Sequence, residues 1–197
     1  MPFLHRIPLL AIFSLALTVS LPAQQPAAKP AAPVVTDDFI QKQFGETCKL
    51  MPGPAPLTAD FDGDGIEDVV IAARCTNPLM DETEKNYKVI DPYDAYFGYG
   101  DPKISIRFAS EDPATRGVVL LVIHGKGPEA WRAETPKAKF IIINLPFKEV
   151  MVKKLPFHKK TIPAIFAAEA HEGEGTISAV FWDGKKYRYQ PMGSTME

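Results

Sequence analysis

The sequence of 197 residues has little excess charge of either sign. It holds 22 lysines and arginines against 24 aspartates and glutamates, for a formal net charge of -2. Nucleic-acid-binding domains usually carry a clustered basic face. The basic cluster here, Lys153 and Lys154 with Lys159 and Lys160, is short and interrupted by Pro156. We therefore expect no nucleic-acid partner and interpret the cluster as a solvated loop.

Long apolar segments are scarce as well, and the longest lies at the N-terminus. Residues 7–21 carry no charge, follow His5 and Arg6, and precede a possible cleavage site after Ala23. Such a stretch is short of the about 20 residues needed to span a bilayer, and no cysteine follows it directly. The pattern predicts a cleaved signal peptide at 1–23, a periplasmic or secreted protein, and no stable membrane insertion after cleavage.

Cysteine is almost absent, since the chain has only Cys48 and Cys75. An isolated pair in an oxidising compartment usually forms a disulfide. Export therefore predicts a bond between Cys48 and Cys75, and two buried free thiols are the alternative.

Catalytic motifs are missing too. The segment 123–125, Ile-His-Gly, is similar to the oxyanion segment of α/β-hydrolases, but no Gly-x-Ser-x-Gly elbow supplies a nucleophile. We interpret His124 as a strand-end residue with local hydrogen bonds. Glu169, His171 and Glu174 could offer zinc ligands, but zinc needs further ligands at recognisable spacing. A polar strand edge is the favoured interpretation of these three residues.

The periodicity that is present predicts one β-rich domain at 36–197, after a Pro/Ala-rich linker at 24–35 with nothing to bury. Thr36 can cap a short helix whose apolar spacing extends to Cys48. Apolar runs then indicate strands at 69–71, 118–123, 140–143, 164–168 and 176–182. The expected fold is mainly β, either antiparallel sheet or incomplete propeller-like blades, with one short N-terminal helix.

Two further segments carry local signals. Asp183-Gly184 predicts a tight two-residue hairpin turn. Segment 76–102 has little periodicity and is expected to be a long ordered loop. Its aromatic residues could form a stacking surface for a sugar or peptide, or could pin the loop to the core, which we favour. They are Tyr87, Tyr93, Tyr96, Phe97 and Tyr99.

The most specific pattern is the aspartate loop, residues 60–68, which reads Asp-Phe-Asp-Gly-Asp-Gly-Ile-Glu-Asp. Calcium takes about 6–8 hard oxygen ligands. Alternating carboxylates on a curled backbone can converge on one point, where they repel one another unless a cation is present. Gly65 allows the sharp turn, and Ile66 can offer its carbonyl oxygen. The loop predicts a Ca²⁺ site, with Mg²⁺ the weaker candidate and a surface turn the alternative.

The flanking residues distinguish this loop from an EF-hand, which needs a glutamate at position 12 followed by a helix. Position 12 is Ile71, inside a strand-forming run. The segment DFDGDGIEDVVIAA at 60–73 resembles the FG-GAP or VCBS repeat of calcium-bearing β-propeller blades, although the chain has only one such loop. The domain as a whole resembles exported bacterial proteins of unknown function. Carried over by residue, the resemblance implies calcium on Asp60, Asp62, Asp64, Asp68 and the Ile66 carbonyl.

Together these features predict an exported calcium-binding protein, a non-enzymatic module that interacts with a protein or a glycan and in which calcium is structural. A secreted hydrolase with an unrecognised active site is the alternative. An enzyme should show a pocket of convergent titratable groups away from the metal, whereas a binding module should show a flat or grooved aromatic surface.

Overall fold

The computed structural model describes residues 35–99, 113–145, 147–169 and 176–194, all of which belong to the compact unit Pro33–Glu197. The expected signal peptide and nearly all of the expected linker lie outside the described residues, as do His171 and Glu174. No helix in the described part is long and apolar enough to cross a membrane.

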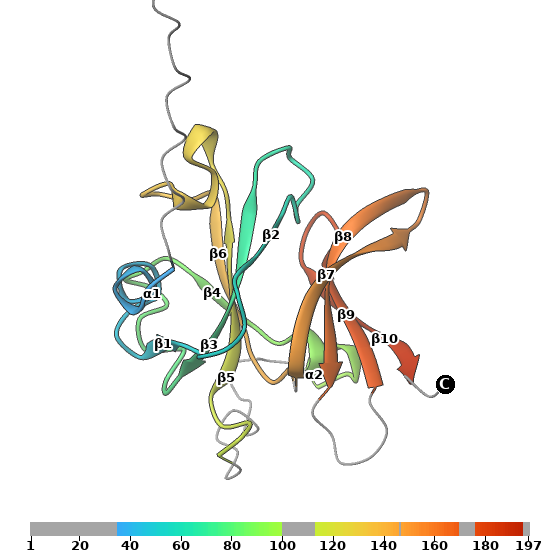
Figure 1. Cartoon of the computed structure of the whole chain (residues 1–197), viewed down its shortest axis with the longest axis horizontal. Coiled ribbons are helices and arrows are strands. Elements are labelled where there is room, and N and C mark those ends of the chain that lie inside the picture. The colour runs from blue at the N-terminus through green and yellow to red at the C-terminus, as the bar shows by residue number, and fades with distance from the viewer. Residues whose placement is uncertain (1–34, 100–112, 146, 170–175, 195–197) are drawn as a thin grey trace, which may run out of the picture. The chain divides into compact units, whose positions relative to one another are not determined.

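Two β-sheets dominate the described residues, so the fold is mainly β, as the sequence predicts (Figure 1). The larger sheet holds β1 (Cys48–Leu50), β2 (Leu57–Ala59), β3 (Asp68–Cys75), β4 (Lys88–Ile90), β5 (Val118–His124) and β6 (Ala138–Ile142). The smaller sheet holds β7 (Phe147–Phe157), β8 (Lys160–Glu169), β9 (Thr176–Trp182) and β10 (Tyr187–Ser194). The helical segments are α1 (Asp37–Phe44), α2 (Pro92–Tyr96) and η3 (Gly127–Arg132), a 3-10 helix.

Strand order in the larger sheet is β1-β3-β5-β6-β4, with β2 also paired to β3. The pair β4–β6 is parallel, and the other pairs are antiparallel. The smaller sheet is an antiparallel array in the order β10-β9-β8-β7. Of the three strands next to the aspartate loop, β3 therefore pairs with both β2 and β5.

Helix α1 confirms the predicted N-terminal helix, and Thr36 Oγ1 accepts the N–H of Phe39 at 3.2 Å as its cap. The helix ends earlier than its apolar spacing suggests. Gly45 adopts a φ of 90° directly after Phe44, and such a left-handed residue terminates a right-handed helix. Cys48 therefore belongs to β1 rather than to the helix.

The predicted disulfide is confirmed. Cys48 and Cys75 lie directly opposite each other in the β1–β3 pair and are bonded. The bond closes a sequence separation of 27 residues, which stabilises the fold by about 3–4 kcal/mol in the chain-entropy model. It fixes the C-terminal end of β3, the strand that begins where the aspartate loop ends.

Strands β3 and β5 are buried on both faces, which explains their continuous apolar sequences. One face packs against α1 and η3 through side chains such as Ile71, Phe44 and Trp131. The other face packs against the smaller sheet through side chains such as Val70 and Val180. Val35, which the sequence assigns to the linker, is buried with the first group.

The prediction of a long loop at 76–102 is wrong within the described residues, because β4 and α2 lie there. Strand β4 has only three residues, too few for a recognisable period of two. Helix α2 begins at Pro92 after Asp91, whose side chain accepts the N–H of Asp94 at 2.8 Å. A capping side chain and a proline at the first helical position both indicate the start of a helix. The segment was nevertheless predicted as a loop, because its apolar residues show little periodicity.

The interpretation of the basic cluster as a loop is also wrong. Strand β7 continues through Pro156 to Phe157, and β8 begins at Lys160 after a two-residue turn. Proline is tolerated here because β7 is an edge strand, which leaves one row of N–H groups unpaired. The turn between β9 and β10 also differs from the prediction, since it spans the four residues 183–186.

Candidate metal centre

The aspartate loop connects β2 to β3, and Ala59 and Asp68 form the last pair of that hairpin. Phe61, its second residue, is buried in the core between the two sheets. Strand pairing therefore fixes both ends of the loop, and the burial of Phe61 anchors it to the core.

Asp60 organises the backbone of the loop. Its Oδ1 accepts the N–H groups of Gly63 at 2.9 Å and Asp64 at 3.0 Å, and its Oδ2 accepts that of Gly65 at 2.9 Å. Gly65 has a φ of 86°, which only a residue without a Cβ adopts cheaply. These contacts confirm the sharp turn that the sequence places at Gly65.

The carboxylates belong to two overlapping groups of potential metal ligands. One consists of Asp60, Asp62 and Asp64, and the other of Asp62, Asp68 and His124, and within each group the ligand atoms lie within 4.8 Å of one another. Asp62 belongs to both groups. The four aspartates named from the sequence therefore gather around Asp62, and the Ile66 carbonyl stays a prediction.

Asp68 is fully buried and fastens the loop to its surroundings. Its Oδ2 accepts the N–H groups of Phe61 at 2.8 Å and Asp62 at 3.2 Å, and its Oδ1 accepts that of Gly125 at 2.7 Å. Burial raises the pKa of Asp68 to about 6, while the Gly125 N–H and the two loop N–H groups oppose the rise. Asp68 thus links the loop to the residue that follows β5.

Position 125 needs glycine because the end of the aspartate loop packs closely against it, and not because of its backbone angles. A Cβ at this position would collide with the Glu67 carbonyl oxygen and would lie 2.8 Å from Ile66 Cγ2. The absence of a side chain lets the end of the loop pack directly against the end of β5.

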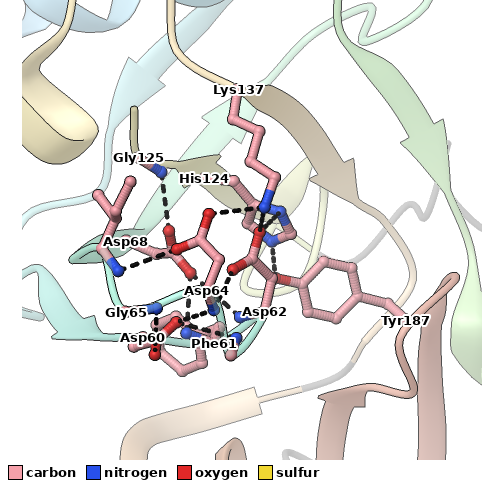
Figure 2. Close-up of polar contacts among 12 residues, drawn as sticks. Asp60, Phe61, Asp62, Asp64, Gly65, Asp68, His124, Gly125, Lys137 and Tyr187 are labelled. Carbon is pink, nitrogen blue, oxygen red and sulfur yellow. Dashed lines mark hydrogen bonds and ion pairs between the residues drawn. The ribbon is translucent and has the colours of Figure 1, made fainter. Parts of the chain in front are cut away.

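Lys137 supplies a cation that the sequence analysis missed. Its Nζ donates to Asp62 Oδ2 at 2.7 Å and to Asp64 Oδ2 at 2.6 Å (Figure 2). The hydrogen bond from Lys137 lowers the pKa of Asp64, and both carboxylates raise the pKa of Lys137. The ammonium relieves the repulsion between these aspartates. A bound metal ion would compete with it for the same oxygens.

His124 joins the loop to the smaller sheet. Its Nδ1 lies 3.2 Å from Asp62 Oδ2 and its Nε2 lies 2.7 Å from the hydroxyl of Tyr187. The prediction of local hydrogen bonds for its ring is therefore wrong, because both partners are more than 60 residues away in the chain. Burial lowers the pKa of His124 and the Asp62 charge opposes that effect.

The chain of contacts from Tyr187 through His124 to Asp62 has the connectivity of a catalytic triad. Its burial argues against that role, because only 5% of Tyr187 and 1% of His124 are exposed. Burial also raises the pKa of Tyr187 well above its ordinary value, which makes its hydroxyl a poor nucleophile. The arrangement positions the Asp62 carboxylate rather than presenting a reactive group to a substrate.

Glu67, at loop position 8, contacts η3 rather than the other carboxylates. Its Oε1 accepts from Trp131 Nε1 at 3.1 Å and from Arg132 at 3.3 Å, and its carbonyl accepts the N–H of Trp131 at 3.1 Å. Its role is to hold η3 beside the loop.

The remaining sequence candidates fall elsewhere. Glu169 is buried in the smaller sheet, where it accepts from the hydroxyls of Tyr189 at 2.6 Å and Thr176 at 3.2 Å.

Tyr87 is buried and donates to the Pro78 carbonyl at 2.8 Å, so it pins its segment to the core. The aromatic residues that follow behave differently, and Tyr96, Phe97 and Tyr99 are 53%, 52% and 65% exposed.

Comparison with protein families, with curated proteins and with solved structures finds no match for this chain. The chemistry of the site therefore rests on its own residues. Four carboxylates and one imidazole converge on a loop that is fixed to two strands, and such a donor set can hold a metal ion.

Proposed function

We propose that this protein is an exported calcium-binding module that acts by binding another molecule and in which calcium has a structural role. The observation that carries the proposal is the convergence of Asp60, Asp62 and Asp64 on one curled loop. Carboxylate oxygens are the preferred ligands of hard cations, and calcium tolerates the irregular geometry of such a loop better than magnesium does.

The other candidate ion is a transition metal, which the imidazole of His124 would favour. His124 contributes one nitrogen beside oxygen ligands from the aspartates, and its Nε2 contacts Tyr187 while its Nδ1 faces Asp62. A site with an oxygen majority favours Ca²⁺ over Zn²⁺.

A structural role for the ion follows from the position of the loop. Asp68 is both the last acidic residue of the loop and the first residue of β3, and β3 ends in the disulfide with β1. An ion that fixes the loop would set where β3 begins. The disulfide and the apolar N-terminal sequence together support export, and N-terminal sequencing of protein from the host's periplasm or medium should find a start near Gln24.

Calorimetric titration of the mature chain with Ca²⁺, Mg²⁺ and Zn²⁺ tests the proposal. We expect calcium to bind with a dissociation constant of about 0.1–1 mM, as in extracellular modules. Asp62→Asn should abolish most of the binding, whereas Asp38→Asn, an exposed residue of α1, should leave it unchanged. Tighter binding of zinc, or calcium binding that survives Asp62→Asn, would contradict the proposal.

A further inference from the structure

A large open groove lies on the smaller sheet. Its volume is about 820 Å³, within the roughly 300–1,000 Å³ typical of small-ligand sites. A smaller hollow of about 270 Å³ adjoins it and shares Tyr96, Arg188 and Tyr189 with it. Its lining includes Tyr96, Phe157, His158, Lys185, Arg188 and Tyr189.

The groove arises from the way the smaller sheet opens. Strand β8 pairs with β9 only over 165–168, although β8 pairs with β7 from Lys160 onward. The tip of the β7–β8 hairpin therefore leaves the ladder (Figure 1). Phe157 at that tip still contacts Phe181 of β9, with ring centroids 4.8 Å apart. The result is a concave surface floored by aromatic side chains.

Positive charge concentrates on this sheet. Residues 147–169 and 176–194 hold eight lysines and arginines against three acidic residues, whereas residues 35–99 and 113–145 hold ten against fifteen. Lys185, Arg188 and His158 line the groove, and Asp183 is the acidic residue among its lining side chains. Asp183 accepts from Arg188 Nε at 2.6 Å, which leaves the other guanidinium donors available to a ligand. The groove therefore favours an anionic ligand.

The aromatic rings that line the groove favour a sugar as the anionic ligand. Tyr96 is half exposed, and its ring packs edge-on against Tyr189 with centroids 5.4 Å apart. Fixed, exposed rings provide flat apolar faces at little entropic cost, and the C–H faces of pyranose rings stack on such surfaces. Addition of a peptide strand is disfavoured, because the edge strand β10 contains Pro191 and a bulge beside it.

We infer that the groove binds an acidic carbohydrate, whose carboxylates contact Lys185 and Arg188 while its sugar rings stack on Tyr96. This inference rests on the interaction half of the proposed function and does not depend on the metal. Arginine and lysine form charge-assisted hydrogen bonds with carboxylates, and the aromatic rim supplies the apolar contact.

Fluorescence or calorimetric titration of the mature chain in EDTA tests the inference, since calcium cannot then bridge the sugar and the protein. The probe is a hyaluronan oligosaccharide, in which every second sugar carries a carboxylate. Its carboxyl-reduced form tests the role of charge, and an oligoglutamate tests the alternative of an acidic peptide. We expect the acidic sugar to bind about tenfold or more tightly than either control. Equal binding of the reduced sugar, tighter binding of oligoglutamate, or no binding of any probe would overturn the inference.

Variants locate the site. Lys185→Gln and Tyr96→Ala should each weaken binding by about tenfold. Lys49→Gln, an exposed lysine of the larger sheet, and Tyr99→Ala, an exposed tyrosine outside the groove lining, are matched controls that should bind normally. Equal losses in variants and controls would contradict the assignment. For the wild-type chain, sugar binding without calcium stabilisation would refute the metal site alone, and calcium stabilisation without sugar binding would refute the groove alone.

Discussion

The ammonium nitrogen of Lys137 lies 2.7 Å from Oδ2 of Asp62, although the two residues are 75 positions apart in the chain. The same nitrogen lies 2.6 Å from Oδ2 of Asp64. The loop therefore has a built-in cation that stabilises it without metal and opposes the entry of a metal ion. The balance between ammonium and ion should set the calcium affinity.

Replacement of Lys137 by methionine tests this balance. Without the ammonium, Asp62 and Asp64 repel each other in EDTA, so the melting temperature in EDTA should fall. Calcium affinity should rise by about threefold to tenfold, because the ion no longer displaces a positive charge. Calorimetry and thermal unfolding measure the two effects.

Lys139→Met is the matched control for that experiment. Lys139 lies two residues further along, and its Nζ donates to the Gln43 carbonyl at 2.6 Å rather than to a carboxylate of the loop. Its loss should lower stability and leave calcium affinity unchanged. An unchanged affinity in Lys137→Met would mean that the ammonium and the ion occupy different places.

Tyr187→Phe tests whether His124 positions Asp62. The change removes the hydroxyl that contacts His124 Nε2 at 2.7 Å, which should cost about 1–3 kcal/mol of stability because a buried polar group loses its partner. It should also weaken calcium binding by about tenfold, since outer contacts orient metal ligands.

The control is Tyr189→Phe, which removes a hydroxyl from the same strand. That hydroxyl donates to Glu169 at 2.6 Å and does not touch the aspartate loop. Tyr189→Phe should therefore destabilise the protein without changing its calcium affinity. If both variants bind calcium equally well, His124 has no part in the metal site.

Gly125→Ala tests the packing of the loop against β5. The new methyl group would collide with the Glu67 carbonyl and crowd Ile66, at a cost of about 1–3 kcal/mol. Displacement of the loop should also reduce the calcium-dependent gain in melting temperature.

Gly53→Ala separates these two effects. Gly53 has a φ of 112°, and a Cβ added there would meet no atom within 4 Å, so alanine there introduces backbone strain alone. Denaturant unfolding should show a lower free energy of unfolding in both Gly125→Ala and Gly53→Ala. A calcium-dependent gain that is unchanged in Gly125→Ala would show that the loop does not need this close contact.

Local patterns in the sequence predicted the elements that local chemistry determines. The cap at Thr36, the apolar run of β5 and the turn at Gly65 each follow from a few neighbouring residues. The disulfide followed from the predicted export and a count of two cysteines. Strands β4 and β7 were not predicted, because β4 has only three residues, too few to show a period of two, and β7 contains Pro156.

The acidic half of the candidate site was visible in the sequence, but the contacts that support it were not. Lys137, just before β6, and His124, at the end of β5, contact the loop directly. Tyr187 of β10 contacts His124. Only the pairing of β3 with β5 and the packing of the two sheets bring them together. His124 carried one weak signal, since it ends an apolar strand beside a glycine that permits close approach.

Thermal unfolding of the mature wild-type chain in EDTA and in about 10–100 mM calcium, roughly 100 times the expected dissociation constant, tests the central claim most directly. Calcium at 100 times its dissociation constant should stabilise the folded state by about 2.7 kcal/mol, which raises the melting temperature by several degrees for a domain of this size. Asp62→Asn should remove most of that gain. Equal melting temperatures of the wild type in EDTA and in calcium would contradict a structural calcium site in the aspartate loop.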